Sequence, residues 1–567
     1  MDLYASDGSD EGTALIGSTL SNSAGRFGFS DFVPAPIAGQ VVFLVASGGS
    51  PIGASNDASR LMAMVGRVCD GCALPEDVTV NAFTTVAAVY RFGALVSLDS
   101  DTPSFHGVTG LDHAARALSH LVDSVDGTAS ADLAPESCTA AGSDPSCLAL
   151  KKLNTLANGV DACAAASGAS APACSNLLSA TGAADTLGAL YEIAVNPVHR
   201  AQGSNVFAAL GTLGSFTPAL SAAPNDWTLA LNHTGGGLNR PSGIAVASDG
   251  SVWAANNVKV GSVSKFAFDG AALSPAAGYT AGGLAGPLGI AIDASDNVWV
   301  ANWNQGSGKT VTKLDASGAP LSGSTGYTAT GMVGPIDIAV TGTGEVWVAN
   351  YSNASLTHLS STGSLLGSIT GGGLNFPSGI ALDAGGRVWV ADQGNDRVSE
   401  FSSAGVPLSA SGYGGMAQPY GIATDAEGFV WAVNFSSNSV ARLVGGSTPP
   451  ATCPTTPSAS DTGCRDPAAG ISGGGLSGPT GLAVDGAGHV WVSNFHGNNI
   501  TELDADSSVL TPAMGYVDGD LLQPYGIAVD AAGSVWVTNL GGNSLTEFIG
   551  IATPIITPRV GPPTAAP

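Results

Sequence analysis

The chain has 567 residues, of which 44 are acidic and 18 are lysine or arginine, so its formal net charge is −26. Only 11% of the residues are charged and 44% are hydrophobic, so the chain can bury a large core and is not disordered as a whole. An acidic surface repels phosphate backbones and anionic lipids, which argues against nucleic-acid binding. The longest clear apolar run, Gln40–Ser47, is far shorter than the ~20 residues that a membrane span needs.

Residues 1–56 show short strand patterns between Gly, Ser and Asn turns, notably at Gly28–Val33 and Val41–Ala46. They resemble the carboxypeptidase-regulatory-like β-sandwich of bacterial surface proteins, and the resemblance implies a partial sandwich. The segment that starts at Met1 is neither basic nor followed by an apolar stretch of signal-peptide type. Because Leu3–Ala5 already reads as part of a strand, we expect a signal peptide and at least one strand upstream of Met1.

Residues 57–220 show helical periodicity, which predicts a helical domain. The expected helices are Ala58–Val68, Val80–Val96, Leu111–Val122, Leu148–Ala166, Asp185–Val195 and Val206–Leu213. Asn81, Asp112 and Asp185 are candidate N-cap or first-turn residues. His113 and His120 are about 10.5 Å apart along a helix axis, too far to share one metal ion, so we expect solvated histidines on the helix surface.

Eight cysteines fall in four local pairs inside Gly/Ser/Pro-rich stretches, which favours short disulfide-closed loops and an oxidising compartment. The pairs are Cys69 with Cys72, Cys138 with Cys147, Cys163 with Cys174, and Cys453 with Cys464. The alternative is that Cys69-Asp-Gly-Cys72 is a redox or metal motif. A single CxxC without a second CxxC or a nearby pair of histidines is a weak zinc signal.

One unit recurs seven times from residue 241 onward. It opens with Pro-x-Gly-Ile-Ala, or a close variant, and continues ten to twelve residues later with Val-Trp and an Asn or Asp three residues beyond the tryptophan. The tryptophans are Trp253, Trp299, Trp347, Trp389, Trp431, Trp491 and Trp536. A period near 45 residues with several short strands per unit predicts a seven-bladed β-propeller over residues 221–552.

The last unit lacks a fourth strand, and a spare strand lies at Trp227–Thr234 just before the first unit. Pairing the two would close the ring and remove both exposed edges. The long interval between Trp431 and Trp491 holds an insertion, Gly446–Ala468, which contains Cys453 and Cys464. Residues 553–567 are Pro-rich and are expected to be extended or disordered.

The units resemble NHL repeats, in the form Pro-x-Gly-Ile-Ala-Val-Asp, Gly-x-Val-Trp-Val-Ala-Asn and Asn-Ser-Val-x-x-Phe. The fold class predicted for the chain is therefore mainly β: a seven-bladed NHL-type propeller preceded by a small, truncated β-sandwich and an α-helical domain. The resemblance extends to streptogramin lyases, gluconolactonase-type calcium enzymes and NHL domains that only bind, so the fold constrains the function weakly.

The repeated Asn and Trp have structural explanations, as a cap of the following turn and as packing between blades. Positions where the units differ are better candidates for a ligand site. Two matched loop positions carry six aromatic residues, namely Trp303, Tyr351, Tyr420, Phe435, Phe495 and Tyr525. They are expected either to line one rim of the central channel and bind a ligand, or to pack against the helical domain or simply cover the ends of the blades.

Signals for catalysis are few. A lyase of the streptogramin type implies His and Glu converging with a metal ion, but His496 is the one propeller histidine expected on the ligand face. A calcium or magnesium site of the gluconolactonase type would use Asp337, Asn350 and Asp392. The sequence therefore predicts a secreted or cell-surface propeller that binds a protein, peptide or glycan, with no cofactor. The alternative is a metal-assisted lyase or lactonase that uses His496 or the pair Asp337 and Asp392.

Overall fold

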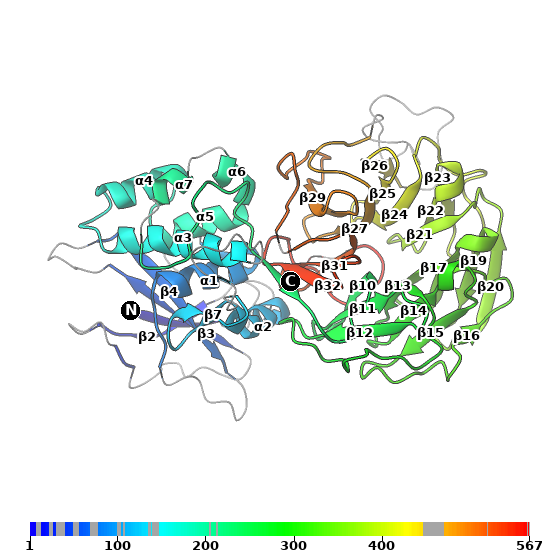
Figure 1. Cartoon of the computed structure of the whole chain (residues 1–567), viewed down its shortest axis with the longest axis horizontal. Coiled ribbons are helices and arrows are strands. Elements are labelled where there is room, and N and C mark those ends of the chain that lie inside the picture. Colours follow the sequence, from blue (N-terminus) through cyan, green and yellow to red (C-terminus); the bar gives the residue numbers. More distant parts are fainter. Residues whose placement is uncertain are drawn as a thin grey trace.

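A computed structural model describes residues 1–6, 13–21, 27–29, 40–48, 56–68, 77–98, 104–105, 108–133, 138, 147–202, 206–210, 214–445, 470–518, 520–563 and 565. It has two parts that lie side by side, an N-terminal layer of helices on a sheet and a ring of small sheets (Figure 1).

Two of the four predicted cysteine pairs lie outside the described residues. They are the pair of Cys69 and Cys72 and the pair of Cys453 and Cys464. The insertion at Gly446–Ala468, which contains Cys453 and Cys464, also lies outside these ranges. A disulfide between Cys69 and Cys72, and one between Cys453 and Cys464, therefore stay predictions.

The N-terminal part contains one antiparallel sheet of order β2-β1-β3-β4. Its strands are β1 (Asp2–Ser6), β2 (Thr13–Ser18), β3 (Val41–Ser47) and β4 (Arg60–Arg67). The helix predicted over Ala58–Val68 is therefore wrong, because this segment is strand β4. Both faces of the sheet are covered, so β4 carries apolar residues on both sides and lacks the alternation that marks a half-exposed strand. The boundary predicted at residue 56 cuts through this sheet.

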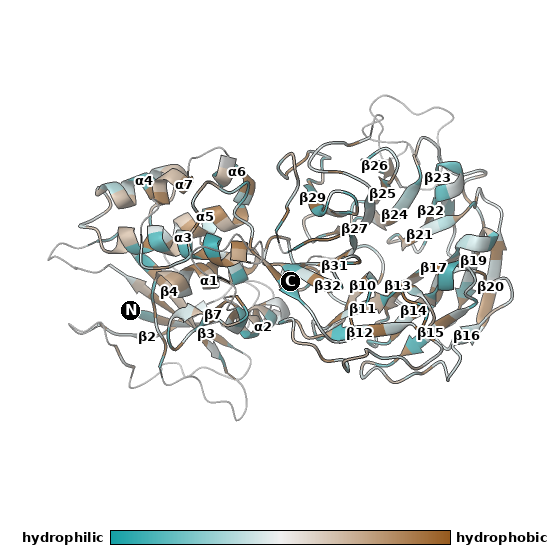
Figure 2. Cartoon of the chain, viewed as in Figure 1, coloured by the Kyte–Doolittle hydropathy of each residue, from teal (hydrophilic) through white to brown (hydrophobic). Residues whose placement is uncertain are grey.

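The other expected helices form, within a residue or a few of their predicted bounds. The described helices are α1 (Ala82–Phe92), α2 (Val108–Ala117), α3 (Leu148–Ala164), α4 (Pro172–Thr181), α5 (Thr186–Val195), α6 (Pro197–Gln202) and α7 (Val206–Leu210). Asn81 caps α1 in a capping box with Thr84, and Asp185 caps α5, as predicted. Asp112 instead lies inside α2. Helices α1, α2 and α5 contact β4, and the apolar residues between them form one core (Figure 2).

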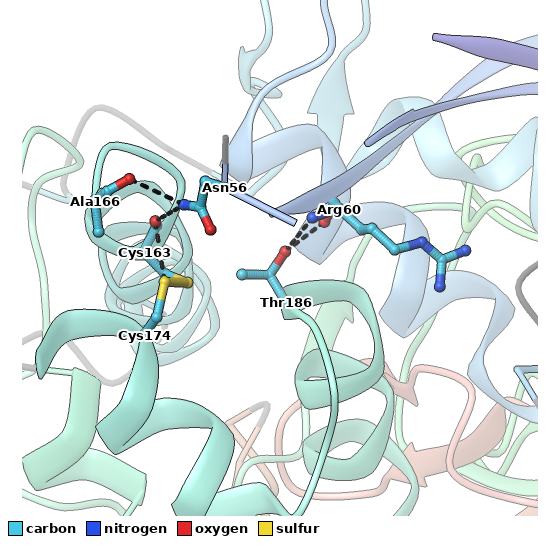
Figure 3. The surroundings of a disulfide bond; sticks show 6 residues. All are labelled: Asn56, Arg60, Cys163, Ala166, Cys174 and Thr186. Atoms are coloured by element: carbon cyan, nitrogen blue, oxygen red, sulfur yellow. Dashed lines mark hydrogen bonds between the residues drawn. A yellow bond between two sulfur atoms is a disulfide. The ribbon is translucent and has the colours of Figure 1, made fainter. Parts of the chain in front are cut away.

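Two disulfides support the N-terminal part, Cys138–Cys147 and Cys163–Cys174, and both pairings are as predicted. Beside the second, Asn56 Nδ2 donates to the carbonyl oxygens of Cys163 (2.7 Å) and Ala166 (3.2 Å) (Figure 3). The bridge joins the end of α3 to the start of α4, so the segment between them is held at both ends.

Residues 230–548 hold seven antiparallel sheets in the part of the chain that is described. In each, the Pro-x-Gly-Ile-Ala segment is the first strand and the Val-Trp segment is the second. The strands are β10 (Pro241–Val246), β11 (Val252–Asn256), β12 (Ser262–Phe266); β13 (Pro287–Ile292), β14 (Val298–Asn302), β15 (Thr310–Leu314), β16 (Tyr327–Thr328); β17 (Pro335–Val340), β18 (Val346–Asn350), β19 (Ser355–Leu359), β20 (Leu365–Thr370); β21 (Pro377–Leu382), β22 (Val388–Asp392), β23 (Arg397–Phe401); β24 (Pro419–Thr424), β25 (Phe429–Asn434), β26 (Ser439–Val444); β27 (Pro479–Val484), β28 (Val490–Asn494), β29 (Asn499–Leu503); and β30 (Pro524–Val529), β31 (Val535–Asn539), β32 (Ser544–Phe548).

The ring closes in the predicted way. Strand β9 (Ala230–His233) pairs antiparallel with β32 and becomes the fourth strand of the last sheet. The first strands of successive sheets pack side by side, and β10 also packs against β30. The seven first strands therefore surround one central channel.

The N-terminal part contacts the ring at the turns between the first and second strands of the first and last sheets, and at the loop that follows β12. His113 stacks on Phe268 with ring centroids 4.9 Å apart, and His120 lies 2.5 Å from Asp132 and 3.6 Å from Asp269. The expectation of solvated surface histidines is thus wrong for His113, which is buried. It is also wrong for His120, because its ring lies between two carboxylates and not free in solvent. Both histidines contact residues of the ring, and such contacts cannot be predicted from helical periodicity.

Candidate ligand-binding end of the ring

The repeated glycine at the start of each first strand is required by close packing in the ring. A Cβ on Gly243 would lie 2.3 Å from the carbonyl oxygen of Leu288 in the next sheet, and one on Gly379 would lie 2.4 Å from that of Tyr420. The third repeat departs from this pattern, because Asp337 stands where the other six repeats have glycine. Its carboxylate occupies the space beside Gly289, whose added Cβ would lie 2.7 Å from Asp337 Oδ1.

Asp337 therefore places a single acidic group on the channel wall. Its Oδ2 accepts a hydrogen bond from the backbone N–H of Ile380 at 3.0 Å. Burial raises the pKa of Asp337 to about 6, because the hydrogen bonds to the charged form only partly offset the loss of water. Close to neutral pH the carboxyl group can therefore gain or lose a proton.

Two tyrosines face one another across the same end of the channel. The hydroxyl groups of Tyr420 and Tyr525 hydrogen-bond to each other, and the two rings meet edge-on with centroids 5.9 Å apart. Burial raises the pKa of Tyr420 to about 12 and that of Tyr525 well above its ordinary value, so both hydroxyl groups stay protonated at neutral pH.

The remaining predicted aromatic residues continue outward from this pair. Ring centroids of Tyr420 and Phe435 are 6.4 Å apart, those of Phe435 and His496 are 5.1 Å apart, and those of His496 and Phe495 are 5.4 Å apart. His496 is exposed, and the phenylalanines are half-buried.

On the other side of the channel, Trp303 and Tyr351 pack on the apolar cluster that contains Leu288 and Ile336. Tyr351 donates from its hydroxyl group to Gln393 Oε1 at 2.9 Å. The members of this cluster all come from residues 288–525. The aromatic residues thus pack among themselves and on the ring, not on the N-terminal helices.

Below these aromatic residues the channel holds a small cavity of about 150 Å³. It is lined by the starts of the seven first strands, among them Leu288, Asp337, Ser378, Tyr420, Thr480 and Tyr525. Tyr420 and Tyr525 stand at its mouth, so the aromatic end is a shallow surface above a narrow channel.

Asp392 lies apart from this surface. It takes the position of the repeated Asn at the end of a second strand, where it is fully buried. Its Oδ2 accepts a hydrogen bond from Ser399 Oγ at 2.5 Å, and its Oδ1 accepts from the backbone N–H of Asn375 at 3.2 Å. Burial raises the pKa of Asp392 to about 7. The prediction that Asp392 binds a ligand or a metal ion is therefore corrected: the residue is buried and stabilises its own sheet.

The repeated Asn has the same role in the other sheets. Its side-chain oxygen accepts from the backbone N–H seventeen residues earlier, as in Asn256, Asn302, Asn434, Asn494 and Asn539. Its side-chain nitrogen donates to hydroxyl or amide groups of the third strand, and in Asn350 these are Ser355 Oγ at 3.1 Å and Thr357 Oγ1 at 2.9 Å. In these five sheets the amide thus fixes the loop before the first strand, whereas Asn350 Oδ1 has no hydrogen-bond partner among the described residues. The role is structural, as expected, but the loop that is held is not the turn that follows the Asn.

One repeated interaction is missed by the sequence reasoning. The Asp that ends Ile-Ala-Val-Asp in five repeats accepts a hydrogen bond from the indole N–H of the tryptophan six residues later. The pairs are Asp293–Trp299, Asp383–Trp389, Asp425–Trp431, Asp485–Trp491 and Asp530–Trp536, with distances of 2.7 to 3.2 Å. The constant spacing of six residues in the sequence is the signal that could have revealed them. The seven repeated tryptophans are buried, so they pack and do not bind.

No three His, Cys, Asp or Glu side chains among the described residues gather in a way that could hold a metal ion. Of the set proposed for calcium or magnesium, Asp337 lines the channel, whereas Asn350 and Asp392 are buried in their sheets. Among the described helices, none is long and apolar enough to cross a membrane.

Comparisons with known proteins agree with the repeat. Residues 374–401 match the NHL repeat model. This segment is the fourth unit, β21 to β23. No match to the chain is found among curated proteins. Solved structures with similar folds include a streptogramin B lyase (17% identity, 56% of this chain and 97% of that chain, TM-score 0.42) and a virginiamycin B lyase from Staphylococcus aureus (18%, 57% and 98%, 0.42). A gluconolactonase from Xanthomonas campestris is also similar (15%, 57% and 89%, 0.34). The chain is mainly β, one of its units matches the NHL repeat, and its ring of antiparallel sheets is a β-propeller.

Proposed function

We propose that this chain is a seven-bladed NHL-type propeller whose role is to bind a protein or peptide at the aromatic end of its channel, without catalysing a reaction. The observation that carries the proposal is a continuous group of rings in which exposed His496 lies among half-buried aromatic residues. The group runs from Phe495 and His496 through Phe435 to Tyr420 and Tyr525. Aromatic residues are enriched in protein interfaces because they bury a large apolar area and keep a polar group at the edge.

The shape of this end favours a macromolecular surface over a small molecule. The cavity behind the tyrosines is about 150 Å³, whereas pockets for drug-sized ligands usually measure roughly 300–1,000 Å³. A partner would instead lie across the rim and contact several sheets at once. Exposed Phe376, beside Tyr351 with ring centroids 5.0 Å apart, extends the apolar area in this direction.

We also propose a secreted or cell-surface location and no bound cofactor. The two disulfides support the location, because such bonds persist in oxidising compartments.

The experiment is affinity capture from a peptide library, followed by titration of a captured peptide with the full chain and two variants. Phe435→Ser removes a ring from the aromatic group, and Phe266→Leu, in a third strand away from the channel, is a control for general packing. A peptide whose affinity falls at least tenfold in Phe435→Ser alone supports the proposal. Capture of glycans in place of peptides, or equal affinity in both variants, contradicts it.

The alternative of a metal-assisted lyase or lactonase is tested by elemental analysis of dialysed protein. One tightly held divalent ion per chain that is lost in Asp337→Ala would favour that alternative over a purely binding role.

A further inference from the structure

The opposite end of the channel contains a second cavity, of about 220 Å³, which the first strands and the C-terminal segment line together. The walls are aliphatic side chains of all seven first strands, for example Val246, Ile292 and Val529. Ile555, Thr557, Arg559 and Gly561 of the C-terminal segment complete the lining. This cavity shares the middle of the channel wall, including Asp337, with the smaller cavity at the aromatic end, but none of the aromatic residues lines it. An inference about it does not depend on the function proposed above.

The C-terminal segment is anchored to the ring on its way into the channel. The backbone N–H of Thr553 donates to Asp485 Oδ2 at 3.0 Å, and its carbonyl oxygen accepts from the N–H of Gly486 at 3.1 Å. Ile555 is buried in the apolar cluster of the last two sheets. Gly486 is needed here, because an added Cβ would lie 2.4 Å from the carbonyl oxygen of Pro554. The sequence predicted an extended or disordered segment. Ile555 and Ala565 instead form an isolated antiparallel bridge, and the place of the segment at the channel was not predicted.

This anchoring places one positive charge, the half-buried guanidinium group of Arg559, at a cavity whose side-chain walls are aliphatic. Arg559 donates from Nε to the carbonyl oxygen of Gly561 at 3.0 Å, which fixes the plane of its guanidinium group. No carboxylate among the described residues forms an ion pair with it. Burial alone lowers the pKa of Arg559 to about 10, although the group remains charged at neutral pH.

A cation in such surroundings is costly unless an anion accompanies it. The chain carries 44 acidic residues against 18 basic ones. Carboxylates are therefore plentiful in this chain, yet none of those described pairs with Arg559. Its two terminal nitrogens have no protein hydrogen-bond partner within the described ranges, and two such parallel N–H groups match the two oxygens of a carboxylate.

We propose that this cavity binds a small aliphatic monocarboxylate, with its carboxylate on Arg559 and its hydrocarbon chain along the isoleucine and valine walls. Apolar cavities of ~150 Å³ hold a benzene-sized molecule, so a space of this size suits roughly eight non-hydrogen atoms. Asp337 lines the same cavity. A second carboxylate on the ligand would meet that acidic group, so the cavity favours ligands with one negative charge.

The test is calorimetric titration of the full chain with hexanoate, and with hexylamine as a probe of the same length and opposite charge. We expect one hexanoate per chain, affinity at least tenfold weaker in Arg559→Met, and unchanged affinity in Arg240→Met. Arg240→Met removes an exposed arginine at the aromatic end, so it controls for net charge. Hexylamine should bind at least tenfold more weakly than hexanoate.

A structural role for Arg559 is separated by the melting temperature without hexanoate. Because the guanidinium group has no carboxylate partner among the described residues, Arg559→Met should melt at the same temperature as the parent chain or higher. The proposal is overturned if hexanoate does not bind, if it binds Arg559→Met as well as the parent, or if hexylamine binds equally well. The contrast between hexanoate and hexylamine needs no variant, so it decides the question even if Arg559→Met fails to fold.

Discussion

The buried ion pair between Arg91 of α1 and Glu547 of β32 should hold the N-terminal part and the ring together. The two side chains are 1% and 0% exposed and form a charge-assisted hydrogen bond. Ser534 Oγ also donates to Glu547 Oε1 at 2.9 Å, and His233 Nε2 lies 3.3 Å from Oε2. Burial raises the pKa of Glu547, but Arg91 and His233 more than offset this and lower it to about 2.

Replacing Glu547 with Gln leaves the Arg91 guanidinium buried without a counter-charge. Removing one partner of a buried pair usually costs about 3–5 kcal/mol. We expect Glu547→Gln to lower the free energy of unfolding by about that amount, which is a large part of the ~5–15 kcal/mol of a typical domain. The double variant Arg91→Met/Glu547→Gln removes the stranded charge as well. It should therefore be more stable than Glu547→Gln alone.

Urea unfolding can follow the two parts separately. All nine tryptophans lie between residues 227 and 536, so their fluorescence reports mainly on the ring, whereas circular dichroism at the helical band reports on the N-terminal helices. In Glu547→Gln the two transitions should move apart. The control is Glu192→Gln, the same substitution in the more exposed pair with Arg200, where about 0–1 kcal/mol is expected. A loss below about 1 kcal/mol for Glu547→Gln, or a double variant less stable than Glu547→Gln, would refute this reasoning.

Three further predictions concern the stability of the fold. Hydrogen bonding to Glu502 and the nearby carboxylates of Asp485 and Asp504 raise the pKa of His489 to about 9. Protonated His489 should therefore add on the order of 2 kcal/mol to the free energy of unfolding below its ordinary pKa of 6.5, and this gain should be lost as the pH rises through about 9. The melting temperature of His489→Gln should match that of the parent above pH 9.5 and lie below it at pH 6. Asn302→Ala removes donors to Thr310 and Thr312 and an acceptor for Ala285, and should cost about 1–3 kcal/mol in urea unfolding. Asn257→Ala, in the loop after β11, removes no side-chain hydrogen bond among the described residues and should cost little. Cys163→Ala/Cys174→Ala should cost about 2–4 kcal/mol, and a reducing agent should destabilise the parent chain but not this variant beyond the effect of the other bridges.

The ring could be predicted from the sequence because its constraints repeat. Six of the seven units supply a glycine where backbones approach within contact distance. Each unit supplies a tryptophan that fills the space between sheets and an Asn or Asp that hydrogen-bonds to the third strand. Because the same pattern of residues occurs seven times, it can be recognised in the sequence. The unpaired strand before the first copy predicted that β9 pairs with β32 and closes the ring. The aromatic residues at the rim followed from the same alignment, because matched positions in successive sheets must lie at the same end of the ring.

The parts that were missed occur once. Strand β4 carries apolar residues at positions that fit a helix as well as a strand covered on both faces, so periodicity alone does not distinguish them. His113 and His120 take their surroundings from Phe268 and Asp269, more than a hundred residues away. Asp392 was misjudged because it comes from a blade next to that of Asp337 and Asn350, which suggested a shared metal site. Its carboxylate instead accepts a hydrogen bond from the hydroxyl group of Ser399 inside its own sheet.

Departures from the repeat therefore separate into two kinds, which the structure distinguishes by what surrounds them. Asp392 departs in residue type but keeps the hydrogen bonds of its position, so the fold absorbs it. Asp337 is different, because it brings an ionisable group to the channel wall and forms no ion pair among the described residues. Burial without a counter-charge disfavours its charged form, and groups perturbed in this way are found more often at functional sites than elsewhere. The channel wall is therefore where the tests of ligand binding are directed.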